Sequence, residues 1–373
     1  MQALRGAKAS LPGPVRGHVL IVTGSYGAGH DAAAREIRLR IGASGRTTHV
    51  TDVVDLFPAG LGVLLRRAYF AQLERMPGSW AWVLCLLGRQ TGISGAAARW
   101  VRRGVGRLVA RRLLMRIDAR TVCVVSTHPF ASQALGELRR TGRLRVPAIT
   151  YLTDASVHEM WVHRGVDQHI AVHQQAAEQA RSLGAADTVL IEPLTPSVQI
   201  YDDVRAIRRD LGLPTDRPIA LVVGGSEGVG DLARTAREIR DSGVAVPVVI
   251  CGRNDRLRSM LAAEPGIVTL GWLDGLSRAI AASDCVVQNS GGFTTLETLA
   301  LGVPLVSYRC LPGHGEENAR ALQSEGMAPW PQTPAALADA IGRALLRPAA
   351  TAAAAWPGRP QLLGVLAVAP VVA

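Results

Sequence analysis

Residues 290–297 read SGGFTTLE, a short glycine-rich turn that follows the apolar run DCVVQN and opens a helical stretch. A glycine-rich turn at the start of a helix presents unpaired backbone N–H groups and the positive end of the helix dipole, which suits a phosphate group. Glu297 stands about one turn into that helix, where it can accept hydrogen bonds from both hydroxyls of a ribose. Turn and glutamate together predict a binding site for a nucleoside diphosphate.

Two further glycine-rich turns also follow apolar runs. GSYGAGH at 24–30 comes after HVLIVT, and GGSEGVG at 224–230 comes after IALVV. Consecutive β-branched residues of this kind are typical of strands that are buried in a parallel sheet. Further strands are expected at 48–55, 121–127, 148–154 and 168–173, and then at 247–252, 267–272, 284–289 and 304–308. This alternation of strand, turn and helix predicts an α/β protein with two successive Rossmann-like domains.

A chain of 373 residues is long enough for two domains that each bury a core. We expect the first domain at 1–195 and the second at 196–346, joined by the proline-containing stretch PLTPS. The segment 347–373 is rich in Ala and Pro without periodicity, so disorder is predicted there. The five widely spaced cysteines and the lack of a leader-like or long apolar run predict a cytoplasmic protein without a transmembrane helix.

A nicotinamide-dependent oxidoreductase is one interpretation of the first glycine-rich turn. In that interpretation Asp52, at the end of the second strand, would bind a ribose. It leaves the turn at 224–230 and Glu297 without a role. The competing interpretation places His30 at the start of the first helix, where the positive helix end keeps an imidazole neutral and able to accept a proton.

Other polar residues follow the expected strands, where α/β sheets place their ligand-binding groups. The stretch TDASVHEMWVH brings together Asp154, His158 and Trp161, and STHP places His128 at another strand end. Arg253 follows a strand of the second domain and could offset diphosphate charge, and His314 lies in a loop after the last strand. A His-x4-His pair at 158–163 lacks a third ligand at suitable spacing, and no Asp-x-Asp pair follows a strand, so we expect no metal or other cofactor.

The positive charge of the chain is concentrated in one segment. Eleven arginines and one acidic residue lie between Leu56 and Arg116, out of a formal net charge of +11 for the whole chain. Arg66, Arg67, Arg102 and Arg103 alternate there with apolar residues at helical spacing, including an expected stripe of Val101, Val105 and Leu108. Amphipathic helices with arginine on the polar face, and with Trp80 and Trp82 at the boundary, suit an anionic membrane surface. An ordinary core helix with a solvated basic face is the alternative. Nucleic acid is not expected, since no binding motif accompanies the charge.

Taken in order, these motifs resemble those of the inverting glycosyltransferases of the monogalactosyldiacylglycerol synthase type, which are related to the peptidoglycan N-acetylglucosaminyltransferase of the lipid II pathway. The resemblance runs from about residue 18 to residue 327 and is carried by GSYGAGHDAAA, STHPFASQAL, TDASVHEMWVH, PLTPS, GGSEGVG, CGRN, GWLDG, SGGFTTLETLALGVP and PGHGEEN. It implies a glycosyltransferase B fold, in which two Rossmann-like domains face each other across a cleft.

The resemblance also implies roles for individual residues. The second domain would bind a UDP-sugar, with Glu297 on the ribose and the backbone at Gly271 and Leu273 near the uracil. The residues around the diphosphate and the sugar would be Gly224, Gly225, Ser226, Arg253, Ser290, Gly291, Gly292 and His314. The first domain would take a membrane lipid acceptor beside Gly27, Gly29, His128, His158 and Trp161, with His30 or Asp154 as general base. The enzyme would then act at the cytoplasmic face of the cell membrane.

Two other activities remain open on the sequence. A UDP-N-acetylglucosamine 2-epimerase would share the fold, but it would not need the basic amphipathic segment. A non-catalytic membrane-binding relative would bind vesicles without turning over a donor, and the unusual segment 347–373 favours it.

Overall fold

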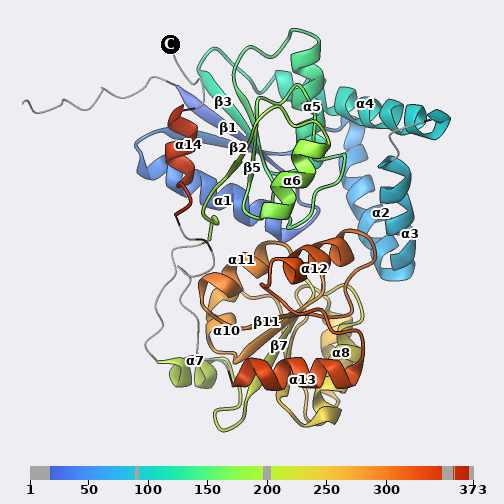
Figure 1. The fold of residues 1–373 in the computed structure, drawn as a ribbon, viewed down its shortest axis with the longest axis vertical. Coiled ribbons are helices and arrows are strands. Elements are labelled where there is room, and N and C mark those ends of the chain that lie inside the picture. The colour runs from blue at the N-terminus through green and yellow to red at the C-terminus, as the bar shows by residue number, and fades with distance from the viewer. Residues whose placement is uncertain (1–16, 89–91, 196–202, 347–355, 357, 369–373) are drawn as a thin grey trace, which may run out of the picture.

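The computed structural model describes residues 17–88, 92–195, 203–346, 356 and 358–368. Two α/β units lie one above the other along the long axis of the molecule (Figure 1). We call the unit that contains the strands between His18 and Leu190 the first domain, and the unit that contains those between Ile219 and Ser307 the second domain.

The first domain is built on a parallel six-stranded sheet with the order β2-β1-β3-β4-β5-β6. Its strands are β1 (His18–Thr23), β2 (Thr47–Asp52), β3 (Thr121–Ser126), β4 (Ala148–Tyr151), β5 (Gln168–Ala171) and β6 (Thr188–Leu190). The helices are α1 (Ala28–Ala43), α2 (Leu61–Arg75), α3 (Pro77–Leu87), α4 (Gly92–Leu114), α5 (Pro129–Arg140) and α6 (Gln174–Ser182). All five expected strands are present. β6 was not expected, because a half-buried run of three residues gives too short a pattern.

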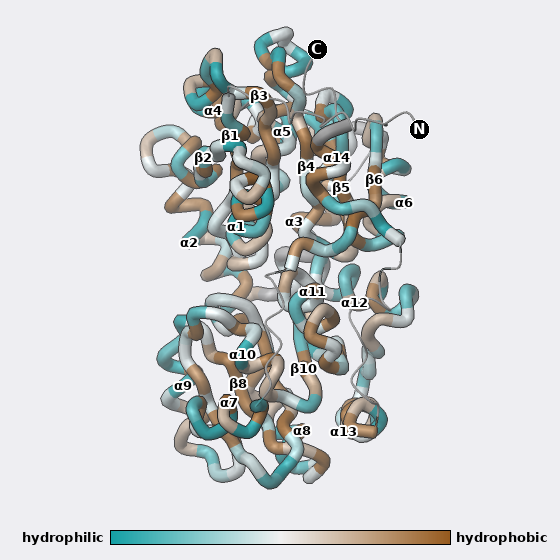
Figure 2. Tube along the Cα trace, turned by 90° about the vertical axis from the view of Figure 1, so that its left-hand side faces the viewer, coloured by the Kyte–Doolittle hydropathy of each residue, from teal (hydrophilic) through white to brown (hydrophobic). Residues whose placement is uncertain are grey.

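The second domain has a parallel five-stranded sheet with the order β11-β10-β7-β8-β9. Its strands are β7 (Ile219–Val223), β8 (Val246–Ile250), β9 (Val268–Leu270), β10 (Cys285–Gln288) and β11 (Leu305–Ser307). The helices are α7 (Val204–Asp210), α8 (Leu232–Ser242), α9 (Asp255–Ala262), α10 (Leu276–Ala281), α11 (Phe293–Ala300), α12 (His314–Ser324) and α13 (Pro334–Leu345). Hydrophobic segments concentrate on the strands inside each domain (Figure 2), as the apolar runs predict.

The strands end one to three residues earlier than the sequence predicts, and this shortening positions the polar residues. β4, for example, ends at Tyr151, so Thr153 and Asp154 lie in the loop beyond the sheet. The carboxyl ends of parallel strands share one edge, and loops at that edge form ligand sites in α/β folds. Here the two sheets turn these edges toward each other.

The domains are in direct contact through α1 and α11. Phe293 and Leu296 of α11 belong to the same hydrophobic cluster as Ala33 and Ile37 of α1. A Cβ atom added to Gly29 would lie only 3.3 Å from Cβ of Phe293, so glycine permits the close approach. The structure is therefore a closed arrangement of the two domains.

The described residues of the segment 347–373 correct the expectation of disorder. Trp356 is buried, and the helix α14 (Leu362–Val368) packs against α1 in the first domain (Figure 1). The backbone N–H of Glu192 donates to the carbonyl of Pro360 at 3.1 Å. Leu362, Val365 and Leu366 form a short apolar stripe that packs on the first domain. The surrounding Ala and Pro made this stripe difficult to recognise in the sequence.

Replacing Leu362 with Ala should lower the free energy of unfolding of the first domain by about 2–5 kcal/mol, the usual cost of truncating a buried Leu. Leu362 is 1% exposed, whereas its neighbour Leu363 on the same helix is 36% exposed. Leu363→Ala is therefore the matched control and should cost less than about 1 kcal/mol. Urea unfolding followed by fluorescence measures both. Equal effects of the two variants would mean that α14 is not part of the core.

Candidate active site between the two domains

His30 is held in one orientation by the strand ends of the first domain. It is the third residue of α1, and its Nδ1 lies 2.8 Å from the carbonyl oxygen of Thr127 and 3.3 Å from the hydroxyl of Thr153. The Thr127 hydroxyl in turn donates to the His30 carbonyl at 3.1 Å. A carbonyl can only accept, so Nδ1 carries the proton. In the neutral ring the lone pair is then on Nε2, which can act as a base.

His128 packs against His30 from the end of β3. Their ring centroids are 4.8 Å apart, and Nδ1 of His128 accepts from the N–H of Phe130 at the start of α5. Burial, followed by the nearby His30 and His158, holds the pKa of His128 well below 6.5. Gly24 leaves room for this ring, since a Cβ atom there would lie 2.5 Å from His128. The first glycine-rich turn thus serves packing around His128.

Asp154, His158 and His314 complete what we call the interdomain cluster with His30 and His128. Burial lowers the pKa of His158 to about 4; Asp154 opposes this shift, and His314 and His30 reinforce it. Burial also lowers the pKa of His314, with Asp154 opposing and His30 reinforcing the shift. Both imidazoles are neutral at pH 7, which leaves Asp154 as the acidic member of the cluster.

His314 comes from the second domain, as the first residue of α12, and its Nδ1 is buried without a hydrogen-bond partner among the described residues. Trp161, which is 1% exposed, lies 5.7 Å from the His30 ring and likewise has an indole N–H without a partner in the described part of the chain. Buried polar groups are normally paired. Two unpaired groups beside His30 are available to a ligand with polar atoms.

Two tyrosines that the sequence analysis did not single out border the same cluster. Tyr69 of α2 interacts with Asp154, and burial raises its pKa above the ordinary value. Tyr26, in the turn at 24–30, packs against the rings of Tyr69 and His128, and burial raises its pKa to about 12. Tyr69 lies in α2, outside the strand-end loops, and Tyr26 lies in the first glycine-rich turn, where the glycines and His30 were the residues singled out.

The turn at 290–292 follows β10 and opens α11, as the sequence predicts. Gly291 has φ +75°, a left-handed conformation that favours glycine, and its N–H donates to Oε1 of Gln288 at 3.2 Å. No side chain caps α11, since its N-cap is Gly292. A Cβ atom added to Gly292 would lie 3.7 Å from Oδ1 of Asp154. The helix start with its positive dipole end therefore faces the interdomain cluster.

Glu297 lies half-buried on α11 beside α1 of the first domain. Burial raises its pKa to about 7; Glu36 reinforces this shift and Arg35 opposes it. Both neighbours are on α1, so the charge state of Glu297 depends on the closed arrangement. A carboxyl group with this pKa changes its charge near neutral pH, and its ionised form could accept hydrogen bonds from the hydroxyls of a ribose.

The second glycine-rich turn and the residues of the expected uracil site lie along one edge of the second sheet. Gly225 has φ +74°, and the carbonyl of Ser226 accepts from the N–H of Arg253 at 2.9 Å. A Cβ atom on Gly224 would clash with Leu232 at 2.6 Å. Gly271 precedes the half-exposed Trp272, and Leu273 packs into the core.

The guanidinium of Arg253 is occupied in this structure. It stacks 4.2 Å above the Trp272 ring and donates to Glu227 at 3.2 Å. Only one of its N–H groups is bonded to Glu227, so other donors of the guanidinium remain for a phosphate.

Asp52 does not have the environment that the oxidoreductase interpretation needs. It caps a short helical turn through the N–H of Val54 at 2.8 Å, accepts from the N–H of Ser25, and also bonds the Ser25 hydroxyl. Its carboxylate is therefore used to hold the first glycine-rich turn. No group of His, Cys, Asp and Glu that could hold a metal ion occurs among the residues that the structure describes.

The candidate membrane-facing residues divide into two groups. Arg67, Arg103 and Trp82 are exposed, the last at 65%, whereas Arg66 is half-buried and the guanidinium of Arg102 donates to the carbonyl of Leu87. The side chain of Trp80 lies outside those that the structure describes. Gly27 has open space around it at the mouth of the first turn. Val101 and Leu108 of the expected apolar stripe are exposed, while α4 buries Ala98, Val109 and Leu113.

Comparison with known proteins identifies the families that this chain resembles. Residues 107–192 match the family described as monogalactosyldiacylglycerol (MGDG) synthase, and residues 217–347 match glycosyl transferases group 1. A processive diacylglycerol beta-glucosyltransferase of Bacillus cereus is 26% identical over 326 residues, which cover 83% of this chain and 81% of that protein. The resemblance to glycosyltransferases of the monogalactosyldiacylglycerol synthase type is confirmed.

Solved structures confirm the glycosyltransferase B fold. The Streptomyces sp. SF2575 glycosyltransferase SsfS6, complexed with thymidine diphosphate, superposes with a TM-score of 0.56 at 16% identity and covers 92% of this chain and 97% of its own. MurG of Acinetobacter baumannii superposes with a TM-score of 0.50 at 16% identity, covering 88% of this chain and 94% of its own. The interdomain cluster and the 290–292 turn lie where the two domains of this fold meet.

Proposed function

We propose that the protein transfers a hexose or N-acetylhexosamine from a UDP-sugar to a membrane lipid with inversion at the anomeric carbon. One observation carries this proposal. The 290–292 turn, which suits a diphosphate, lies against Asp154 in the same cluster as His30, whose Nε2 can take a proton. A leaving-group site and a base thus meet in one cleft. The diacylglycerol glucosyltransferase of Bacillus cereus supports a lipid acceptor.

In the reaction, Nε2 of His30 removes the proton of the acceptor hydroxyl as its oxygen attacks the anomeric carbon. The bond from that carbon to the UDP oxygen breaks on the opposite face, through a transition state with oxocarbenium character. UDP leaves with negative charge, which the start of α11 stabilises. Asp154 is the alternative base. Because His30 has a defined tautomer, we assign the proton transfer to His30 and a supporting negative charge to Asp154.

The donor is held through its nucleotide. Glu297 accepts from the two ribose hydroxyls, the backbone at Gly271 and Leu273 contacts the uracil, and Gly224, Gly225 and Ser226 border the phosphates. SsfS6 in complex with thymidine diphosphate supports a nucleoside diphosphate in this fold. A nicotinamide cofactor fits less well, because Asp52 is already bonded within the first turn.

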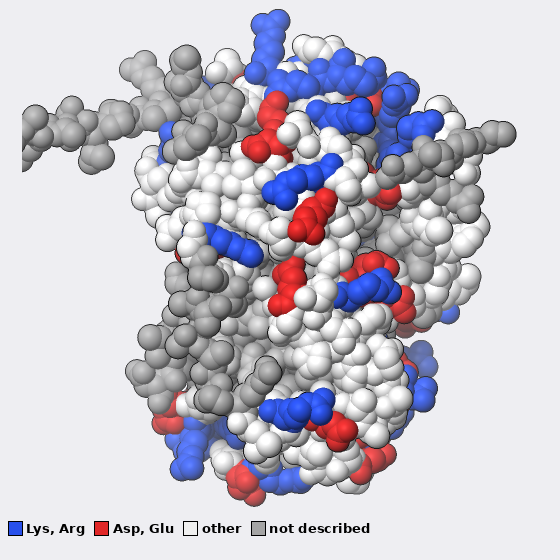
Figure 3. All heavy atoms as spheres, viewed as in Figure 1, with Lys and Arg blue, Asp and Glu red and all other residues white. Residues whose placement is uncertain are grey.

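The acceptor lipid would reach the cleft from a membrane-facing surface formed by α2, α3 and α4. These helices lie side by side on one flank of the first domain (Figure 1), and each exposes large apolar side chains. Among them are Leu64, Met76, Trp82 and Trp100, the last 73% exposed. On the face that Figure 3 shows, arginine side chains gather at the far end of the first domain, and the second domain carries charges of both signs. No described helix is long and apolar enough to span a bilayer.

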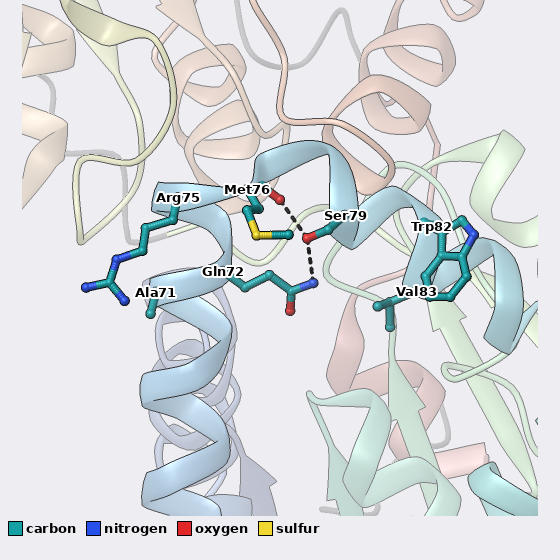
Figure 4. Close-up of a pocket in the computed structure, with 7 residues that line it drawn as sticks. All are labelled: Ala71, Gln72, Arg75, Met76, Ser79, Trp82 and Val83. Carbon is teal, nitrogen blue, oxygen red and sulfur yellow. Dashed lines mark hydrogen bonds between the residues drawn. The ribbon is translucent and has the colours of Figure 1, made fainter.

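A hollow of about 380 Å³ on this flank is suited to part of a lipid chain (Figure 4). It is lined by Ala71, Gln72, Arg75, Met76, Ser79, Trp82 and Val83. Gln72 donates to the Ser79 hydroxyl at 2.8 Å, which ties α2 to α3 beside the hollow. Apolar walls with an arginine at the rim favour an acyl chain with an anionic or polar head group.

Replacing both Arg67 and Arg103 with Glu should weaken binding to vesicles that contain anionic lipid about thirty-fold or more. Each cation near such a surface contributes about 1 kcal/mol, and the change removes two cations and adds two anions. The matched control reverses Arg205 and Arg256, two exposed arginines of the second domain. Vesicle sedimentation measures both. Equal weakening in the control would place the membrane contact elsewhere.

Calorimetric titration with UDP, beside NAD, tests the donor assignment. UDP binding without NAD binding supports it, whereas NAD binding alone would restore the oxidoreductase interpretation. A 2-epimerase would convert UDP-N-acetylglucosamine without any lipid. A folded protein that binds vesicles but neither nucleotide would be a non-catalytic relative.

A further inference from the structure

Asn318 joins the two domains directly behind the 290–292 turn. It lies in α12, is 0% exposed, and uses both ends of its amide. Nδ2 donates to the carbonyl of Ser290 at 2.8 Å, and Oδ1 accepts from the backbone N–H and the hydroxyl of Ser156 at 2.8 and 2.7 Å. Ser156 belongs to the first domain, two residues after Asp154. One side chain therefore links the loop that carries Asp154 to the turn that faces it.

Few other contacts of the described residues hold the 290–292 turn on the side next to Asn318. Gly291 sits so close to Asn318 that a Cβ atom added to the glycine would lie 2.7 Å from Cβ of Asn318. On the inner side, Oε1 of Gln288 accepts from the N–H of Gly291 and from the hydroxyl of Thr295. The turn is thus held between the side-chain amide of Gln288, at the end of β10, and that of Asn318. Among the described residues, the Asn318 oxygen accepts only from Ser156 of the first domain.

A second set of contacts, at the end of α12, joins it to the first domain without involving the turn. Oε2 of Glu325 lies 3.0 Å from Nδ1 of His173, and Oε1 accepts from the N–H of Gln175 at 2.9 Å. The hydroxyl of Ser324 donates to the side-chain oxygen of Gln175 at 2.8 Å. These contacts close the interface at the end of α12, about two turns from Asn318. They provide a comparison in which the domains meet without touching the turn.

We infer that Asn318 is a positioning residue that transmits domain closure to the diphosphate-facing turn. When the domains are together, Ser156 fixes the amide of Asn318, and the amide fixes the Ser290 carbonyl and with it the backbone that leads into the start of α11. When they separate, Oδ1 loses both donors, so the amide holds the Ser290 carbonyl less firmly. Coupling of this kind is reciprocal, so a nucleotide that favours the ordered turn also favours closure. The inference rests on the proposed donor site.

Ser156→Ala tests the inference, because it removes one donor to Asn318 from a residue of the other domain. Loss of one such hydrogen bond changes an equilibrium about five-fold. We expect hydrogen exchange in peptides covering 288–293 of the free protein to become about five-fold faster, and UDP affinity to fall by a similar factor. Ser324→Ala also removes an interdomain hydrogen bond and should change neither quantity. If Ser156→Ala behaves like Ser324→Ala, the inference is wrong.

Asn318→Asp provides the second variant, since it keeps the acceptor for Ser156 but replaces the donor to the Ser290 carbonyl with an oxygen. Its exchange in 288–293 should be faster than that of Ser156→Ala, and adding Ser156→Ala to it should have no further effect. Additive effects of the two changes would overturn the inference. Exchange is measured without ligand, so a protein that binds no UDP would refute the donor assignment and still leave the coupling testable.

Discussion

Replacing His30 with Ala should reduce the rate constant of sugar transfer by about three orders of magnitude while UDP affinity stays within a factor of two. General base catalysis by a positioned side chain contributes about 10²–10⁴-fold, and this imidazole is fixed by Thr127 and Thr153. UDP release from a UDP-sugar in the presence of lipid vesicles measures the rate, and calorimetry measures the affinity. A residue that acts only in proton transfer should affect the rate constant of sugar transfer and not the UDP affinity.

Two comparisons make this result specific. His49 lies exposed on β2 and stacks on His18, so His49→Ala is the same change away from the cleft and should leave the rate unaltered. Asp154→Asn separates the two candidate bases. If His30→Ala retained more than a tenth of the rate while Asp154→Asn abolished it, the proton transfer would belong to Asp154.

Replacing Glu297 with Ala should weaken UDP binding about a hundred-fold. Hydrogen bonds to a charged group are worth about 1.5–3 kcal/mol each, and a ribose offers two hydroxyls. Glu297→Gln keeps the shape and one acceptor oxygen, so its loss should be smaller. The binding isotherms of both variants provide the measurement. Unchanged UDP affinity in Glu297→Ala would mean that the ribose does not bind at α11. The assignment of the 290–292 turn to the diphosphate would then also be wrong.

The same residue makes donor binding depend on pH. The pKa of Glu297 is about 7, raised first by burial and then by Glu36, with Arg35 opposing. The carboxylate is the better acceptor, so affinity should fall as pH decreases through about 7 and level off above about pH 8. UDP-glucose is the appropriate ligand, because its diphosphate diester does not titrate in this range. In Glu297→Gln, the part of the pH dependence of UDP-glucose affinity that comes from this carboxyl group should disappear. If the affinity of this variant still depends steeply on pH, another residue is responsible.

The fold was largely predictable because buried parallel strands give long β-branched runs, and glycine-rich turns mark where those strands end. His30 and Glu297 could be selected for the same reason, since each follows such a turn. The contacts between the two domains could not be predicted from the sequence. Ser156 and Asn318 are 162 positions apart in the chain, and only the closed arrangement of the domains brings them together.

Two features of the sequence had misleading local patterns. α14 was not predicted because its short apolar sequence lies among Ala and Pro and lacks polar residues that would show a helical period, and its packing against α1 is visible only in the fold. In α4, the spacing picked out the stripe of Val101, Val105 and Leu108 but not the buried face of the helix, which carries Ala98, Val109 and Leu113. Helical periodicity cannot decide which of two apolar faces is buried, and here α5 takes the face that contains Gly106 and Val109.

Sugar transfer to lipid is the most direct test of the account. The protein would be incubated with a panel of UDP-hexoses and UDP-N-acetylhexosamines and with vesicles that contain diacylglycerol and an anionic phospholipid, and the extracted lipids would be examined by mass spectrometry. The account predicts a glycosylated lipid whose mass exceeds that of its acceptor by one sugar residue, formed in step with UDP and absent with His30→Ala. UDP-sugar consumption without any glycolipid, or no consumption by protein that binds UDP, would contradict it.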